Sequence, residues 1–321
     1  MAECNAAKLP CDVNTAFTRY DGPPIAVSEA DTFRQILGAL RWLCLTRVDI
    51  TFTCNAFCRY TKNPGPAHVA GVKRILRYIA GTLDEGLKFT HGNGAVNLEA
   101  YADADFAGEA TTMRSIAAHI IRFNPTSSPF SWSCRLQKTP ATSTCQAEYV
   151  ALFEGCREIV HVRGILSELL PPQHLPLPPT ILFGDNAGAI ALGQNPVQTN
   201  RNKHFPTKLH FTRLLVQAGT VRLCKAPSAT MWADSLTKAL PLPTFALHRR
   251  TLHGKAPPSR PDLETIITLP PFIDFDPAAD CAAAFTDLQL SETAAPVPLL
   301  RSFSRVRTLS RQPTPRGGVL E

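Results

Sequence analysis

The order of strand-like and helix-like segments after residue 97 is the strongest constraint on the fold of this chain. Three short strand-like segments are separated by turn-prone residues, and they read LEAYADADFA, SIAAHIIRF and FSWSCRL. A long helical pattern then runs from Thr144 to about Leu170, with Ser143 and Gln146 spaced as a capping box, and two prolines end it. Three consecutive strands followed by a helix predict an antiparallel meander within a mixed α/β domain.

The segments that follow extend the same sheet. TILFGD is a predicted strand that ends at Asp185, and the chain then passes through Asn186 and Gly188 into a short helix. We expect a helix over residues 203–218, a strand at TVRLCKA and a last helix over residues 230–239. The whole pattern predicts an α/β fold with a mixed five-stranded sheet flanked by helices.

The first part of the chain has a different pattern. Residues 1–27 show no sustained periodicity and contain three prolines, which predicts an extended lead-in. Residues 28–92 carry three helical patterns, the first capped by Ser28, the second over about residues 48–60 and the third after Pro66.

The third helical pattern, after Pro66, has a basic face. Lys73, Arg74 and Arg77 form that face, which either contacts a nucleic acid backbone or is an ordinary solvated surface. The sequence does not decide between the two.

The charge distribution points to an anionic partner. The chain carries a formal charge of +7, for which nucleic acid is the usual candidate. From Lys255 onward there are seven basic and eight acidic residues, so the excess lies in the preceding part. Residues 254–321 are rich in proline, and we expect a disordered tail there.

Cysteine usage and hydropathy exclude several classes of protein. The ten cysteines are scattered without a CxxC pair, which is typical of reduced thiols in an intracellular protein rather than of a zinc site. The N-terminus lacks a charged start followed by an apolar core, and no apolar run approaches the roughly 18 residues of a membrane span. We expect neither secretion nor a membrane anchor.

Four acidic residues fall on four different predicted elements: Asp103, Glu148, Asp185 and Asp234. Each alone is more often a turn, cap or helix-dipole residue. Asp103, however, lies among small or apolar neighbours, where an unpaired carboxylate is costly without a cation. Two Mg²⁺ ions about 4 Å apart require a cluster of carboxylates, which these four residues could form.

Seven motifs after residue 97 resemble, in their order, the ribonuclease H domain of copia-type retrotransposon polyproteins. Within residues 97–253 they read YADADFAG, RSIAAH, FSWSCRLQKT, TSTCQAEYVAL, GDNAGAIAL, NRNKHFPTKLHF and WADSLTKALP. The resemblance implies a ribonuclease H-like fold, and it carries the acidic tetrad of that family onto Asp103, Glu148, Asp185 and Asp234. Asp105 faces the same side of its strand as Asp103 and competes for the first position, which we assign to Asp103.

The resemblance implies an Mg²⁺-dependent endonuclease that cleaves the RNA strand of an RNA/DNA hybrid, with Mn²⁺ as a substitute metal. One ion would activate a water and the second would stabilise the leaving oxygen. Asp103 would bridge both ions, and Glu148 and Asp185 would hold one of them. Asp234 would complete the site of the other ion, and Glu148 would also contact the 2′-hydroxyl that distinguishes RNA from DNA.

Basic residues near the sixth motif are candidate nucleic-acid contacts. They are Lys203, His204, Lys208 and Arg213, with a solvated helix face as the alternative. His204 and His210 could assist proton transfer or product release, or simply cap and pack a surface helix.

The upstream residues resemble the end of a copia-type reverse transcriptase, after its palm. The polymerase aspartate motif is absent, so we expect no polymerase activity, and the palm would be a partner within the parent polyprotein. Two other functions stay open: a catalytically silent remnant that binds nucleic acid or only folds, and an integrase-like transferase, whose three-acid pattern fits these motifs poorly. The implied location is a cytoplasmic particle or the nucleus, and the sequence does not indicate an oligomeric state.

Overall fold

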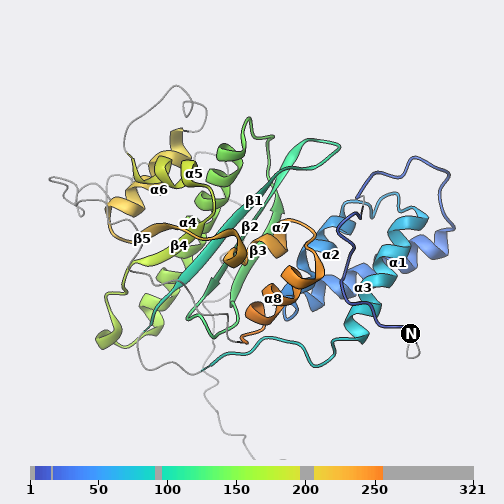
Figure 1. Cartoon of the computed structure of the whole chain (residues 1–321), viewed down its shortest axis with the longest axis horizontal. Helices are drawn as coiled ribbons and strands as arrows, with labels where there is room; N and C mark the ends of the chain where they lie inside the picture. The colour runs from blue at the N-terminus through green and yellow to red at the C-terminus, as the bar shows by residue number, and fades with distance from the viewer. Residues whose placement is uncertain (1–3, 16, 91–95, 196–205, 256–321) are drawn as a thin grey trace, which may run out of the picture. The chain divides into compact units, whose positions relative to one another are not determined.

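The computed structural model describes residues 4–15, 17–90, 96–195 and 206–255 (Figure 1). All of them belong to the first of two compact units, residues 1–275, and the second unit, residues 276–321, lies wholly outside the described residues. Nearly all of the predicted tail lies outside them as well, and so do Lys203 and His204.

A mixed sheet of five strands forms the centre of the described chain, in the order β3-β2-β1-β4-β5. The strands are β1 (Glu99–Glu109), β2 (Arg114–Arg122), β3 (Ser131–Leu136), β4 (Thr180–Gly184) and β5 (Val221–Lys225). The first three strands are antiparallel neighbours, whereas β4 runs parallel to β1 and β5 runs parallel to β4. The predicted ribonuclease H-like fold with a mixed five-stranded sheet is confirmed.

Helix α4 (Thr144–Leu169) covers one face of the sheet (Figure 1). Ala100, Ala102 and Ala104 of β1 point to that face and are buried with the apolar side of the helix. The Ser143 side chain accepts a hydrogen bond from the Gln146 backbone N–H at 3.2 Å, as predicted. The Gln146 side chain accepts hydrogen bonds from Thr142 instead, so the second half of the predicted capping box does not form.

The opposite face of the sheet carries larger side chains. Strand alternation places Tyr101 there, stacked on Phe183 and buried with Trp232, which is 1% exposed. The shorter elements around the sheet are α5 (Ala187–Gln194), α6 (Pro206–Gln217), η3 (Ser228–Thr230), α7 (Asp234–Thr237) and η2 (Pro172–His174). The predicted helix over residues 230–239 is wrong, because only the single turn α7 forms within it.

The upstream residues form a helical region with its own apolar cluster. Its elements are α1 (Val27–Leu43), η1 (Val48–Ile50), α2 (Thr51–Cys58) and α3 (Pro66–Ala80). The predicted Ser28 cap is wrong, since the N-cap of α1 is Ala26, two residues earlier, and it makes no side-chain hydrogen bond. None of the described helices is long and apolar enough to cross a membrane.

Helix α8 (Leu242–Leu252) belongs to the ribonuclease H-like segment in sequence but packs with the upstream helices. Phe245 lies in their apolar cluster, with its ring centroid 5.9 Å from that of Tyr78 in α3. The two segments therefore share a core.

A buried ionic network joins the same two segments. Asp49 in η1 is 1% exposed and pairs with Arg47 at 2.9 Å and with His253, just after α8, at 3.2 Å. The other ring nitrogen of His253 lies 3.0 Å from Glu85, which follows α3. Burial opposes ionisation of Asp49, but His253 and Arg47 hold its pKa below the ordinary range.

We predict that Asp49→Asn lowers the free energy of unfolding by about 3 to 5 kcal/mol, because it leaves the buried Arg47 charge without its partner. Urea denaturation measures this loss. Asp21→Asn is the matched control, since the Asp21–Arg19 pair is about three-quarters exposed and contributes little. Equal stability of the two variants would contradict the prediction.

Candidate metal centre

Asp103 is held in the middle of β1. It pairs with Ala118 of β2 in the antiparallel register, and it is only 1% exposed. The Thr237 hydroxyl of α7 donates a hydrogen bond to its Oδ2 atom. A rigid strand therefore fixes the backbone of this carboxylate, and a hydroxyl group orients its side chain.

Glu148 and Asp185 meet Asp103 at one edge of the sheet. Glu148 lies in the second turn of α4, and Asp185 follows β4 directly. One oxygen from each of the three carboxylates lies within 4.8 Å of the others. Among the residues that the structure describes, no other group of three metal-binding side chains comes so close together.

Burial and mutual repulsion make this group unfavourable as three anions. Burial raises the pKa of Glu148 to about 9, and the neighbouring Asp103 and Asp185 charges add to the shift. Burial and Asp103 also raise the pKa of Asp185. The group consists only of hard oxygen donors, which Mg²⁺ prefers, and a bound dication would remove the repulsion. The residues therefore fit a magnesium site.

Asp234, the fourth predicted carboxylate, lies beside this group rather than within it. Burial and the neighbouring Asp103 raise its pKa to about 7. Its Oδ1 atom is 3.0 Å from the Lys238 ammonium group. Thus three of the four predicted carboxylates form one group, and the fourth is at its margin in an ion pair.

Sequence reasoning missed Lys238 and Thr237. Burial alone would lower the pKa of Lys238, but the carboxylates of Asp103 and Asp234 raise it. Lys238 is therefore the cation that partly offsets the acidic group. The spacing of Asp234 and Lys238, four residues apart in a predicted helix, was the available signal.

Asp105 has a different environment from Asp103. A bulge interrupts the pairing of β1 with β2 between Asp105 and Glu109, and Ala107 takes a positive φ of 53° there. The Asp105 carboxylate folds against Gly108, where an added Cβ would lie 2.1 Å from its Oδ2 atom. Asp105 is thus turned toward the bulge and stands outside the group of three, which favours Asp103 for the first position.

The predicted nucleic-acid contacts on α6 have unequal surroundings. Arg213 is buried, and its Nε atom donates to the Leu192 carbonyl of α5 at 2.9 Å, so its position is that of a structural residue. The Lys208 ammonium lies 5.5 Å from the ring centroid of Phe153 on α4. His210 is exposed on α6. Contact of Lys208 with nucleic acid stays a prediction.

The basic face of α3 is largely engaged within the chain. Arg74 pairs with Asp12 at 2.6 Å, and the Nε atom of Arg77 donates to the Asn5 carbonyl at 2.6 Å. Both partners belong to the extended lead-in, which the two arginines hold against α3. Neither of the two interpretations of this face, nucleic-acid contact or free solvated surface, describes these two arginines.

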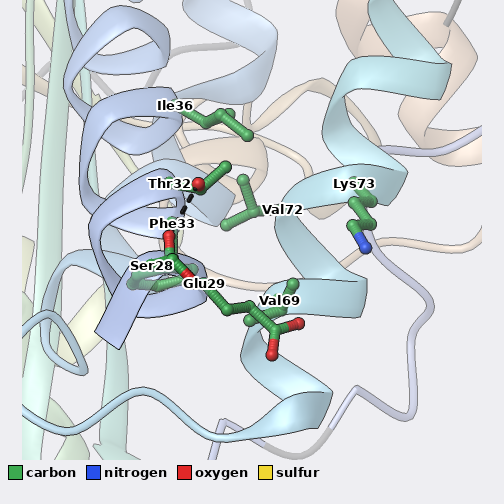
Figure 2. A pocket seen from close by; sticks show the side chains of 8 residues that line it. All are labelled: Ser28, Glu29, Thr32, Phe33, Ile36, Val69, Val72 and Lys73. Atoms are coloured by element: carbon green, nitrogen blue, oxygen red, sulfur yellow. Dashed lines mark hydrogen bonds between the residues drawn. The ribbon is translucent and has the colours of Figure 1, made fainter. Parts of the chain in front are cut away.

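A hollow of about 200 Å³ lies between α1 and α3 (Figure 2), and none of its lining residues belongs to the acidic group. Its walls are mainly apolar, from Phe33, Val69 and Val72, and Figure 2 shows Glu29 and Lys73 extending from its two helices. One acid and one base on separate helices do not form a metal site or a catalytic group.

The mixed sheet and its helices define a ribonuclease H-like domain, with a buried acidic trio that could bind a metal. No protein-family model matches the chain. The solved structure of LC11-RNase H1, isolated from compost, aligns with a TM-score of 0.34 at 13% sequence identity, over 44% of this chain and 92% of that chain.

Curated sequence relatives identify the family. The chain is 35% identical over 261 residues, or 81% of its length, to the retrovirus-related Pol polyprotein from transposon RE2 of Arabidopsis thaliana. It is 35% identical over 245 residues to the polyprotein from transposon RE1 of the same plant. The chain belongs to the Pol polyprotein family of copia-type retrotransposons, as its motifs predicted, and it spans 17% and 16% of the lengths of these two relatives.

The raised pKa of Glu148 predicts a pH dependence of stability in metal-free protein. Its folded pKa of about 9 exceeds the ordinary value of 4.5, so the folded state binds more protons than the unfolded state between these values. The free energy of unfolding should therefore fall as the pH rises from about 5 to about 8.

Urea denaturation in EDTA at several pH values measures this effect. Glu148→Gln should flatten the dependence, whereas Glu29→Gln, on the exposed side of α1, should leave it unchanged. An identical pH profile for the native chain and Glu148→Gln would show that Glu148 ionises normally.

Proposed function

We propose that this chain is an Mg²⁺-dependent endonuclease that cleaves the RNA strand of an RNA/DNA hybrid. One observation carries the proposal: oxygens of Asp103, Glu148 and Asp185 converge within 4.8 Å in a largely buried site. Three carboxylates this close can all be ionised at neutral pH only beside a cation, and the cluster is the arrangement that metal-assisted phosphodiester cleavage requires.

The carboxylates would hold the metal, and their surroundings would keep them in place. Bound Mg²⁺ supplies an activated water and stabilises the leaving oxygen, and Mn²⁺ would serve as a substitute. Asp103 is the central ligand in the proposal, because its negative charge raises the pKa of each of the other three carboxyl groups, Glu148, Asp185 and Asp234. Asp185 follows the strand directly and is only part-buried, so it borders the open side of the site.

Asp234 and Lys238 would adjust the charge at the margin of the site. The Lys238 side chain is 39% exposed and pairs with Asp234 at 3.0 Å. Its ammonium group could therefore move from Asp234 into solvent while the apolar core keeps its packing. Asp234 would then be free to complete the site of a second ion. The contact of Glu148 with the substrate 2′-hydroxyl is part of the same proposal.

The proposed setting is reverse transcription of a retrotransposon, inside the cell. The polymerase palm of the parent polyprotein would present the hybrid, and the net charge of +7 favours an anionic substrate.

The decisive experiment is cleavage of an end-labelled RNA/DNA hybrid by the purified chain in Mg²⁺ or Mn²⁺. We expect RNA-strand products with 5′-phosphate and 3′-hydroxyl ends, no cleavage of duplex DNA, and a loss of at least about a hundredfold in Asp185→Asn, which lacks a proposed ligand charge. Asp21→Asn, a surface control with the same chemical change, should cleave at the native rate.

Two outcomes would replace this proposal. Binding of the hybrid without cleavage in either metal, by protein shown to be folded, would establish a silent nucleic-acid-binding remnant. Cleavage that persists in Asp185→Asn would show that the acidic group is not the active site.

A further inference from the structure

Two cysteine thiols of the helical region lie together where the end of α1 packs on α2. Cys44 is the C-cap residue of α1, and Cys54 lies within α2. The Cys54 thiol donates a hydrogen bond to the Cys44 sulfur. Both side chains are free thiols.

A second side-chain contact fixes the two helices beside these thiols. Arg41, one turn before Cys44 on α1, donates a hydrogen bond to the side-chain oxygen of Asn55, which follows Cys54 directly on α2. The amide nitrogen of Asn55 in turn donates to the Cys134 carbonyl of β3 at 2.8 Å, which holds α2 from the other side. The contact between the two sulfurs is therefore part of a fixed interface between the helices.

Their surroundings make the two thiols chemically unequal. The hydrogen bond from Cys54 lowers the pKa of Cys44, burial opposes this shift, and the guanidinium group of Arg41 adds to it. The same hydrogen bond, together with burial, raises the pKa of Cys54. The thiolate is the nucleophilic form of cysteine, so Cys44 is the sulfur that reacts first, with Cys54 as its neighbouring proton donor.

The other cysteines near this pair are less reactive. Burial raises the pKa of Cys58, and it raises the pKa of Cys134 to about 11. Cys44 also has a small opening to solvent, at 6% exposure, whereas Cys54 is fully buried. A small neutral oxidant therefore reaches Cys44, and the oxidised Cys44 sulfur has Cys54 beside it.

We propose that Cys44 and Cys54 are a redox-active pair, which hydrogen peroxide converts into a disulfide bond that joins α1 to α2. In the first step the Cys44 sulfur attacks one peroxide oxygen and becomes a sulfenic acid, while the O–O bond breaks and the departing hydroxide leaves as water with the Cys44 proton. In the second step the Cys54 sulfur attacks the Cys44 sulfur, and the S–O bond breaks. The second hydroxide leaves as water with the Cys54 proton. The two thiols lose two electrons in total, and the peroxide gains them.

The disulfide bond would close a short loop that contains Arg47 and Asp49, the groups that join the helical region to His253. A cross-link removes conformations from the unfolded chain, so oxidation should stabilise this region. Neither thiol takes part in the proposed cleavage, so the pair can be tested apart from it.

Peptide mapping of the full chain tests the pair. The native protein is treated with hydrogen peroxide at neutral pH, the remaining thiols are blocked with N-ethylmaleimide under denaturing conditions, and trypsin cleaves the chain after its arginines. We expect the peptides 42–47 and 48–59 to be joined, with the loss of two hydrogen atoms. Fragmentation should place the bond on Cys54 rather than Cys58, and dithiothreitol should release the two peptides.

Two alanine variants on α2 form a matched pair. Cys54→Ala should abolish the cross-link, whereas Cys58→Ala, the same chemical change one turn later, should form it as the native chain does. Peroxide should raise the urea midpoint of the native chain and of Cys58→Ala, and it should leave that of Cys54→Ala unchanged. The peptide map of the native chain holds even where a variant folds poorly.

Two results would overturn the proposal. A native chain in which Cys44 stays free under peroxide, or forms its bond with another cysteine, would reject the pair. An unchanged urea midpoint in a chain that carries the cross-link would reject the stabilising role of the bond between α1 and α2.

Discussion

The parallel pairing of β1 with β4 is the contact on which the candidate site depends. Tyr101 lies opposite Phe183 in the register, and their rings stack with centroids 4.9 Å apart. Asp103 and Asp185 each come two residues later, so the same register places both carboxylates at one level beyond the paired segment. A shift of one residue would turn one of the two acids to the opposite face of the sheet.

Without a bound cation, repulsion among the buried carboxylates destabilises the folded state. Burial and neighbouring charges raise the pKa values of Glu148 and Asp234 to about 9 and about 7, although Lys238 offsets part of the negative charge. Apolar replacements would relieve this repulsion, so stability alone does not account for the acidic side chains. The acidic side chains are instead explained by a function that needs concentrated negative charge.

The sequence predicted the strands, α4 and the acidic set because these depend on local patterns and on ordered motifs. It did not predict α8, since prolines at 241 and 243 obscured a helix whose apolar side packs on a distant segment. Nor did it predict that Arg74 binds the lead-in or that Arg213 is buried. Periodicity reports which side of a helix is polar, but a long-range partner decides whether that polar side meets solvent.

The packing of α8 on the upstream helices makes part of the sheet domain depend on the helical region. A fragment that began at residue 97 would keep all four acidic residues, yet Phe245 and His253 would lose the surfaces that cover them. The nuclease-like sheet is therefore not an independent module. Any domain exchange or fusion with this chain should transfer the helices and the sheet together.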